Sequence, residues 1–304
     1  MSMYHNEKVF PLKKDIHFGK RLLTEGNTNN TSRTIMATYL ENMRRHFQAN
    51  NRVKEEKRVH AAKVHSVDWS CDGRRLASGS FDKTVNVFLL ERDRLNKDIT
   101  FRGHGDSVDQ LCWHPTNPDQ LVTASENINI CWSPDGSTIA VGNKDDLITF
   151  IDVKSHRSRA EEQFKFEINE ISWNTDGDLF FLTSGKYFAT GSADALVSLW
   201  DTIELVCVRT FSRLDWPVRT LSFSYDGKML ASASEDLVID IAEVESGEKI
   251  SEIACESPTF TVAWHPKRHL LAYACDDKYE RDRDAGNVKV YGFPNSSDNS
   301  MFAY

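Results

Sequence analysis

Residues 67–80 read Val67-Asp68-Trp69-Ser70-Cys71-Asp72-Gly73, then two residues, then Leu76-Ala77-Ser78-Gly79-Ser80. The pattern returns at residues 221–234 as Leu221-Ser222-Phe223-Ser224-Tyr225-Asp226-Gly227 followed by Leu230-Ala231-Ser232-Ala233-Ser234. Alternating apolar residues on both sides of an Asp-Gly pair are typical of two short strands joined by a tight turn. One such unit cannot bury its apolar face alone, so the repetition predicts several units stacked side by side.

Each unit divides into four short strands, and the first strand carries an aromatic residue. These aromatics are Trp69, Trp113, Trp132, Trp173, Phe223 and Trp264. The second strand holds small residues, as at 189–192, and the third is rich in β-branched and aromatic residues, as at 197–201. From about residue 54 to residue 292 the chain therefore predicts short antiparallel strands rather than helices.

Two spacings between first-strand aromatics are too short. Complete units place these aromatics about 41 to 44 positions apart, but Trp132 follows Trp113 by 19, which is about 23 short of one unit. Phe223 follows Trp173 by 50, which is about 32 short of two units. Restoring both shortfalls gives a ring of seven units, of which this chain lacks about five of roughly 28 strands.

The positions of the two breaks follow from the strand pattern. At residues 125–126, a second strand ending at Ser125 is followed at once by a first strand, so the third and fourth strands are missing. Near residues 185–186, segments 180–184 and 187–191 both have the pattern of a second strand. Alternative splicing and an incomplete gene model both account for these gaps better than a new fold. We expect exposed strand edges at both breaks.

Gly103-His104 before a strand, Trp200-Asp201 at the end of one and the unit length resemble WD40 repeats, which form β-propellers. In that family a His before the first strand, a Ser or Thr in the second, an Asp before the third and a Trp in the third form a buried hydrogen-bond network. The resemblance assigns a structural role of this kind to His104, Asp82, Ser192, Asp194, Trp200 and Asp236. Phe88 and Tyr291 stand where Trp would be, so those copies of the network are expected to be incomplete.

The predicted fold class is therefore an all-β WD40 propeller, ancestrally seven-bladed, with incomplete blades near residues 125–126 and 185–186. The propeller is expected over 54–293, after a basic N-terminal extension over 1–53 and before a disordered tail over 294–304. Within the extension we expect disorder up to residue 33 and an amphipathic helix over 34–52, because Met36, Leu40, Met43 and Phe47 recur at helical spacing.

Charge is divided unevenly along the chain. Residues 1–63 carry 13 Lys and Arg against 6 Asp and Glu, whereas the rest carries 24 against 39. An acidic body is a poor nucleic-acid binder, so contact with RNA is expected only through the basic extension, weakly or indirectly; simple solvation is the alternative. Six scattered cysteines and the absence of a long apolar run predict a soluble protein of a reducing, intracellular compartment.

Catalytic and cofactor motifs are missing from the sequence. It contains no Gly-x-Ser-x-Gly elbow, no phosphate-binding Gly-Lys-Ser/Thr loop and no His-Glu-x-x-His zinc helix. His265 and His269 are four residues apart, but Pro266 and the strand context argue against a metal pair. We therefore expect no enzymatic activity, no cofactor, no metal and no small-molecule substrate.

The stronger functional signal is a loop that precedes a first strand. Residues 212–219 place Trp216 beside Pro217, with Arg213, Asp215 and Arg219 around it. Trp and Arg are frequent anchors of protein interfaces, although Trp216 could instead pack into its own blade. Phe260 and the turn Asp145-Asp146 should lie on the same rim and are weaker candidates for binding a protein partner.

Longer stretches carry a narrower resemblance, among them 63–67, 81–84, 102–115, 143–146, 156–164, 211–223 and 255–260. They resemble the WD40 subunits of the THO complex, part of the TREX assembly that couples transcription and splicing to mRNA export. The resemblance implies a nuclear, non-enzymatic scaffold whose partners are other THO and TREX subunits. The alternative is a WD40 adaptor of another complex, such as a ubiquitin-ligase substrate receptor.

Overall fold

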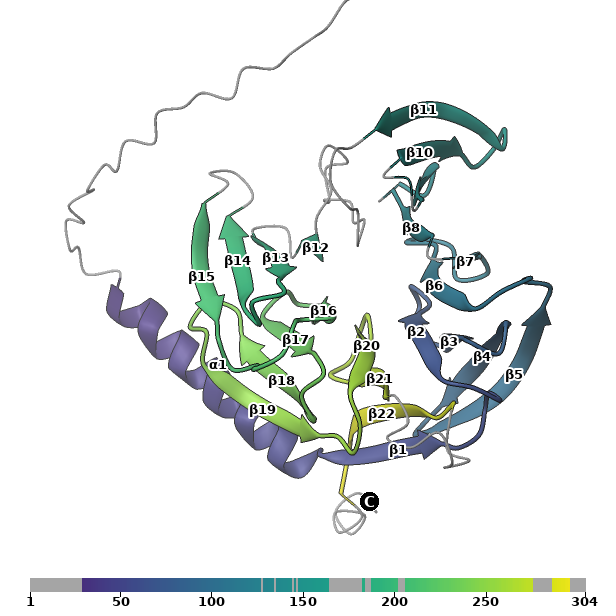
Figure 1. Cartoon of the computed structure of the whole chain (residues 1–304). Helices are drawn as coiled ribbons and strands as arrows, with labels where there is room; N and C mark the ends of the chain where they lie inside the picture. Colours follow the sequence, from purple (N-terminus) through teal and green to yellow (C-terminus); the bar gives the residue numbers. More distant parts are fainter. Residues whose placement is uncertain are drawn as a thin grey trace, which may run out of the picture.

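The strands form a series of small antiparallel sheets arranged around an arc (Figure 1). The computed structural model describes residues 29–126, 128–133, 135–143, 145, 147–163, 182–183, 187–201, 206–275 and 286–295. These residues contain five four-stranded sheets and one two-stranded sheet. Blade-like sheets placed radially form a β-propeller, so the predicted fold class is confirmed.

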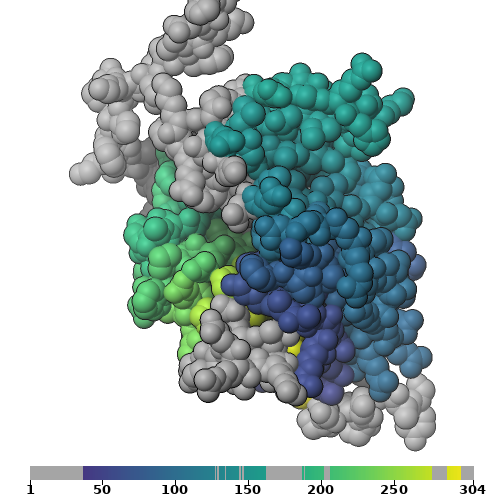
Figure 2. All heavy atoms as spheres, turned by 45° about the vertical axis from the view of Figure 1, so that its right-hand side comes forward, coloured from purple at the N-terminus to yellow at the C-terminus, as the bar shows by residue number. Residues whose placement is uncertain are grey.

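The sheets follow the chain in order. The first contains β2 (Val64–Trp69), β3 (Arg75–Ser80), β4 (Thr84–Glu91) and β5 (Arg94–Arg102). The two-stranded sheet contains β6 (Val108–Trp113) and β7 (Leu121–Ser125). The next contains β8 (Asn129–Trp132), β9 (Thr138–Gly142), β10 (Leu147–Asp152) and β11 (Arg157–Gln163). In the space-filling view the blue and teal part of the chain, which holds these three sheets, forms one continuous wall (Figure 2).

The second half of the chain forms three further sheets. One contains β12 (Leu182–Thr183), β13 (Tyr187–Gly191), β14 (Val197–Asp201) and β15 (Cys207–Phe211). Another contains β16 (Thr220–Phe223), β17 (Met229–Ala233), β18 (Val238–Glu243) and β19 (Lys249–Ala254). The last contains β20 (Thr259–Trp264), β21 (Leu271–Cys275) and β22 (Val288–Phe293), and its fourth strand is β1 (Arg52–Glu56) from the other end of the propeller.

Asp-Gly turns set the register of the hairpins. Between β2 and β3, Asp72 accepts hydrogen bonds from the Ser70 hydroxyl (2.6 Å) and the Arg74 N–H (3.0 Å), and Gly73 has a φ of 74°. Such a φ favours glycine, and a Cβ on Gly73 would lie only 2.3 Å from His265 of the last sheet. The turn thus joins two sheets as well as two strands.

Tryptophans of the inner strands join consecutive sheets. Three of these indole N–H groups donate to a carbonyl of the preceding inner strand: Trp69 to Ala263 (3.3 Å), Trp113 to Asp68 (3.1 Å) and Trp132 to Cys112 (3.0 Å). The indole N–H of Trp264, in β20, makes no such bond. Because the series runs through Trp113 without interruption, the inner wall continues across the two-stranded sheet. At these three positions the repeated aromatic of the first strand therefore connects neighbouring sheets.

The first break lies where the sequence predicts it. β6 and β7 form a sheet of two strands, and β8 begins the next sheet at Asn129. The chain omits the outer half of this blade and keeps the inner half.

The second break differs from the expectation. Residues 180–184 were expected to form a second strand, but Leu182 and Thr183 pair with Ala189 and Phe188 of β13 and take the inner position of its sheet. Among the described residues no other first strand precedes β13, so its inner edge can pair with this short segment. The neighbouring residues 164–181 and 184–186, including Trp173, lie outside the described residues, and so does the tail from residue 296.

The helix α1 (Asn29–Ala49) begins five residues before the expected start at 34 and ends three before the expected end at 52. Asn50 donates from its side chain to the His46 carbonyl (2.8 Å), which closes the helix before β1 begins at Arg52. Figure 1 shows α1 lying along β19. Leu40 and Phe47 are buried there against the last two sheets, so the predicted apolar stripe is an anchor to the propeller.

Candidate partner-binding surface

A buried polar network closes the first sheet. His60 Nδ1 lies 3.1 Å from Asp82 Oδ2, and His60 Nε2 lies 2.8 Å from the Ser78 hydroxyl. Burial lowers the pKa of His60, so the imidazole is neutral, although Asp82 opposes the shift. Burial alone would raise the pKa of Asp82, but hydrogen bonds from Thr84 and the Ala61 N–H lower it. The sequence indicated Asp82, whereas His60 was not recognised because Val59-His60 lacks the Gly-His signature.

The other proposed network residues have separate partners. His104 Nε2 lies 2.7 Å from the Thr123 hydroxyl, in the sheet that has lost its third strand. Trp200 donates to Thr190 (3.0 Å) rather than to Ser192, because Trp200 is paired with Phe188 and Thr190 is its diagonal neighbour on the same face of the sheet. Ser192 instead accepts from the Asp194 N–H (3.4 Å).

Asp236 holds the loop that carries the candidate anchor. Its carboxylate accepts from the N–H groups of Asp215 (2.9 Å) and Trp216 (3.2 Å) and from the Ser234 hydroxyl (2.5 Å). The loop backbone is fixed, yet the Trp216 side chain is 55% exposed. Of the two alternatives for Trp216, the structure has the exposed one.

Arg213 lies in a different environment from Trp216. Its guanidinium makes two hydrogen bonds to the buried Asp240 carboxylate (2.8 and 2.7 Å) and a third to the Gly247 carbonyl (2.8 Å). Such a two-pronged pair holds the arginine in one geometry. Arg213 therefore fastens the loop to the sheet β16–β19.

Arg219 and Phe260 meet across two sheets. The Arg219 guanidinium lies 5.3 Å from the centre of the Phe260 ring, and the Lys63 ammonium lies 5.1 Å from the same ring. Lys63 is also 6.0 Å from the Phe81 ring, which is 54% exposed. Two cations around aromatic faces are a typical cation–π arrangement. We name these four residues, Lys63, Phe81, Arg219 and Phe260, together with the exposed Trp216 on the loop that leads to Arg219, the rim cluster.

The rim cluster combines features that suit a protein interface. Arg219 also pairs with Glu235, so its charge is partly balanced, and the His65 ring lies between Phe81 and Phe260, with ring centres 6.1 and 6.0 Å away. The sequence indicated Trp216, Arg219 and Phe260 separately. Lys63 and Phe81 were missed as contacts because the loops that carry them belong to another sheet, much earlier in the chain.

The acidic turn lies elsewhere. Asp145 is in the turn between β9 and β10, in a sheet that the β6–β7 sheet separates from the rim cluster, and Asp146 lies outside the described residues. Within the described ranges no group of three or more His, Cys, Asp or Glu side chains is arranged to hold a metal ion. The same ranges contain no helix with the length and apolarity needed to cross a membrane.

Comparison with known proteins identifies the repeat. A family model described as "WD domain, G-beta repeat" matches residues 53–88 and 161–201, and one described as "Anaphase-promoting complex subunit 4 WD40 domain" matches residues 197–267. THO complex subunit 3 of Arabidopsis thaliana is 41% identical over 297 positions, covering 78% of this chain and 94% of that protein. The chain belongs to the THO complex subunit 3 family of WD40 proteins. This family is non-catalytic.

Two further proteins are more distant from this THO complex subunit 3 family member. The WD repeat-containing protein AAC3 of Dictyostelium discoideum is 28% identical, over 76% of this chain and 65% of that protein. The solved β-propeller domain of Cps50 (Swd1) from Myceliophteria thermophila has a TM-score of 0.48 and 16% identity, over 77% of this chain and 84% of that chain.

The alignment with the Arabidopsis protein also measures what is missing. It spans 297 positions, but 78% of the 304 residues is only about 237, so about 60 positions of the relative have no counterpart in this chain. The two short spacings between first-strand aromatics account for most of that difference. This THO complex subunit 3 homologue therefore lacks internal segments.

Proposed function

We propose that the chain is a scaffold subunit of a THO/TREX-type complex, which acts in the nucleus and couples transcription and mRNA processing to mRNA export. The main support is the 41% identity to THO complex subunit 3 over 94% of that protein. The geometry of the chain is compatible with this role, since its exposed aromatic and cationic groups lie on loops that hydrogen bonds hold in place.

We propose that the rim cluster is the docking surface for another THO subunit. Trp216 and Phe81 are each more than half exposed, and both project from loops held by an aspartate, Asp236 and Asp82 respectively. A large aromatic on a fixed backbone loses little conformational entropy when it becomes buried. Arg219 and Lys63, which both lie against the Phe260 ring, would contact acidic or aromatic groups of the partner.

The test is affinity purification of the tagged full chain from nuclear extract, followed by variants. Recovery of the other THO subunits supports the proposal, and recovery of a cullin adaptor without them contradicts it in favour of a ubiquitin-ligase receptor. Trp216→Ala should weaken recovery by about 2 kcal/mol, roughly thirty-fold. Val208→Ala, on the outer strand β15 with a 44% exposed side chain, is the matched control and should recover THO subunits normally.

Contact with RNA through residues 1–53 is proposed as weak or indirect. Two arginines of α1 are engaged within the chain, Arg44 with Glu248 (3.0 Å) and Arg45 with Glu41 (3.0 Å). An electrophoretic assay with single-stranded RNA should show binding that falls steeply between low and physiological salt. Tight binding at physiological salt would contradict the proposal.

A further inference from the structure

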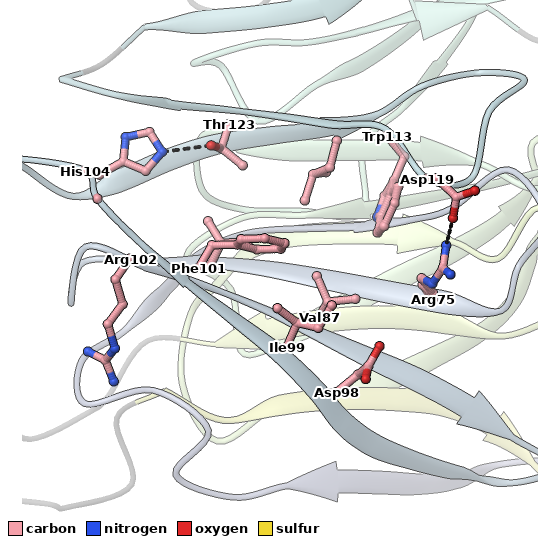
Figure 3. A pocket seen from close by; sticks show the side chains of 13 residues that line it. Arg75, Val87, Asp98, Ile99, Phe101, Arg102, His104, Trp113, Asp119 and Thr123 are labelled. Carbon is pink, nitrogen blue, oxygen red and sulfur yellow. Dashed lines mark hydrogen bonds and ion pairs between the residues drawn. The ribbon is translucent and has the colours of Figure 1, made fainter.

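The two-stranded sheet leaves a groove beside it. A cavity of about 500 Å³ lies between the sheet β2–β5 and the sheet β6–β7. Its apolar lining comes from both sheets: Val85, Val87, Ile99, Phe101, Trp113 and Leu121. Ile99 and Phe101 of β5 are 45% and 52% exposed, because the neighbouring sheet lacks the two outer strands that every other described sheet has. Figure 3 shows these side chains pointing into the groove.

One wall of the groove is the edge of a strand. Within the described ranges β7 pairs with β6 alone, whereas β3, at the same place in the first sheet, pairs with β2 and β4. An unpaired edge presents backbone N–H and C=O groups that an extended segment can pair with. The apolar side chains below it would meet every second side chain of that segment.

His104 requires a polar group from the segment that binds in the groove. In the first sheet, His60 uses Nε2 for the Ser78 hydroxyl and Nδ1 for Asp82, the residue that precedes β4 by two positions. In the two-stranded sheet His104 uses Nε2 for the Thr123 hydroxyl in the same way (2.7 Å). The strand that would bring an aspartate to its Nδ1 is the one this blade lacks. An aspartate just before the apolar residues of an added strand would take that place.

Charges give the groove a direction. Figure 3 shows Arg102 and His104 at one end, and Asp98 with the Arg75–Asp119 ion pair (2.7 Å) at the other. A strand antiparallel to β7 enters at the end with Arg102 and leaves at the end with Asp98. Its leading end should therefore be acidic and its trailing end basic or neutral.

The chain already completes a sheet with a distant strand. β1 pairs along β22 and serves as the outer strand of the last sheet, although β1 begins the propeller sequence and β22 ends it. Strand addition to a blade is thus compatible with the local geometry of this fold.

We propose that this groove binds an extended segment of a partner protein as an added strand, antiparallel to β7. The segment begins with an aspartate that contacts His104, and its alternating apolar side chains pack on Ile99 and Phe101. This site is separate from the rim cluster and does not depend on membership of a THO complex.

The probe is a fluorescein-labelled peptide amide of residues 193–200, which contains Asp194 and most of β14 and so reproduces such a strand. Binding to the full chain is measured by fluorescence anisotropy. We expect saturable binding that weakens at least tenfold with Phe101→Ser or His104→Ala in the protein. Asp194→Ala or Ser198→Pro in the peptide should have the same effect, because the first removes the carboxylate and the second a backbone N–H.

Val208→Ser is the control, since Val208 is 44% exposed on β15, far along the chain from the groove, and should bind the peptide normally. Phe101 and His104 are both at least partly accessible, so their variants should keep the melting temperature of the parent chain. The proposal is overturned if the peptide does not bind, or if its affinity is unchanged by Phe101→Ser and His104→Ala. Sedimentation of the free chain as a dimer that Phe101→Ser dissociates also overturns it, because a second copy would then be the occupant.

Discussion

Both the backbone conformation of Gly73 and its contact with the neighbouring sheet require a residue without a side chain. Its φ of 74° is one that L side chains rarely adopt, and the His265 ring fills the space where a Cβ would be. His265 in turn lies 2.9 Å from the Gly73 carbonyl and packs on Trp69 with ring centres 4.8 Å apart. The same joint recurs between Gly136 and His114. Single residues thus carry the connection between sheets.

Gly73→Ala should destabilise the protein by about 2–4 kcal/mol, from left-handed backbone strain and the clash with His265. Gly105→Ala is the matched control, because nothing lies within 4 Å of its would-be Cβ, and it should change stability by less than about 0.5 kcal/mol. Urea unfolding followed by tryptophan fluorescence measures both. Equal midpoints for the two variants would contradict the role assigned to this joint.

His265 should make stability depend on pH. Burial lowers its pKa to about 4, and its Nδ1 accepts the Lys267 N–H (3.0 Å), which a protonated ring could not do. The unfolded chain has the ordinary His pKa of about 6.5, so it binds the proton first as pH falls. The contribution of neutral His265 to the free energy of unfolding is therefore complete above about pH 6.5 and is lost progressively as the pH falls to about 4.

Allowing for residual screening, the loss from His265 should be on the order of 2 kcal/mol. Urea midpoints measured from pH 7 to pH 4 should fall for the parent chain and fall less for His265→Gln. Parallel curves for the two proteins would show that His265 does not titrate in this way.

At the scale of elements, helix α1 acts as part of the propeller. Phe47 is 2% exposed and stacks on Tyr291 with ring centres 5.5 Å apart, and Tyr39 donates to Asp226 (3.1 Å). Phe47→Ala should cost about 3–4 kcal/mol of stability, as expected for truncating a buried aromatic. Arg45→Ala, which removes only an exposed pair with Glu41, should cost less than about 1 kcal/mol in the same urea unfolding experiment. Similar losses for both would contradict the anchoring role.

Sequence patterns predicted the elements better than their contacts. The Asp-Gly turns and period-two alternation indicated the hairpins, and the short spacing from Trp113 to Trp132 located the two-stranded sheet. The apolar stripe of α1 indicated an amphipathic helix, but nothing in it specified that Phe47 packs on Tyr291, near the other end of the chain. Leu182 and Thr183 were expected in a second strand but form the first strand of their sheet. Pairing depends on which strand edge is unpaired, and the periodicity of apolar residues carries no information about that.

The rim cluster shows the same limit. Trp216 and Arg219 were identifiable from residue type and the nearby proline. Lys63 meets Arg219 at the Phe260 ring only because three sheets converge there, and Phe81 lies beside Lys63. Arg213 looked equivalent to Arg219 in sequence. Both arginines lie against an aromatic ring, but their carboxylate partners differ. Arg213 makes two hydrogen bonds to the buried Asp240, whereas Arg219 pairs with the partly exposed Glu235.

For the whole molecule, the two-stranded sheet β6–β7 is the incomplete blade within the described residues. Inserting a second copy of residues 82–102, which contain β4 and β5, between Ser125 and Glu126 supplies a strand pair for the open edge. The insertion should cover Ile99 and Phe101 and raise the free energy of unfolding by about 2 kcal/mol. The insertion should also abolish the rise in fluorescence anisotropy that shows binding of the peptide of residues 193–200. Undiminished peptide binding by a folded insertion variant would contradict the assignment of the groove.

The pairing of β1 with β22 also governs when the protein can finish folding. During synthesis β1 leaves the ribosome long before its partner, since Glu55 precedes its contact Asn287, the residue just before β22, by 232 positions. At about 5–20 residues per second this delay lasts roughly 10–50 seconds. Throughout that interval the segment Arg52–Glu56 has no partner strand to pair with. Four of its five residues are charged, which disfavours pairing with a non-native strand.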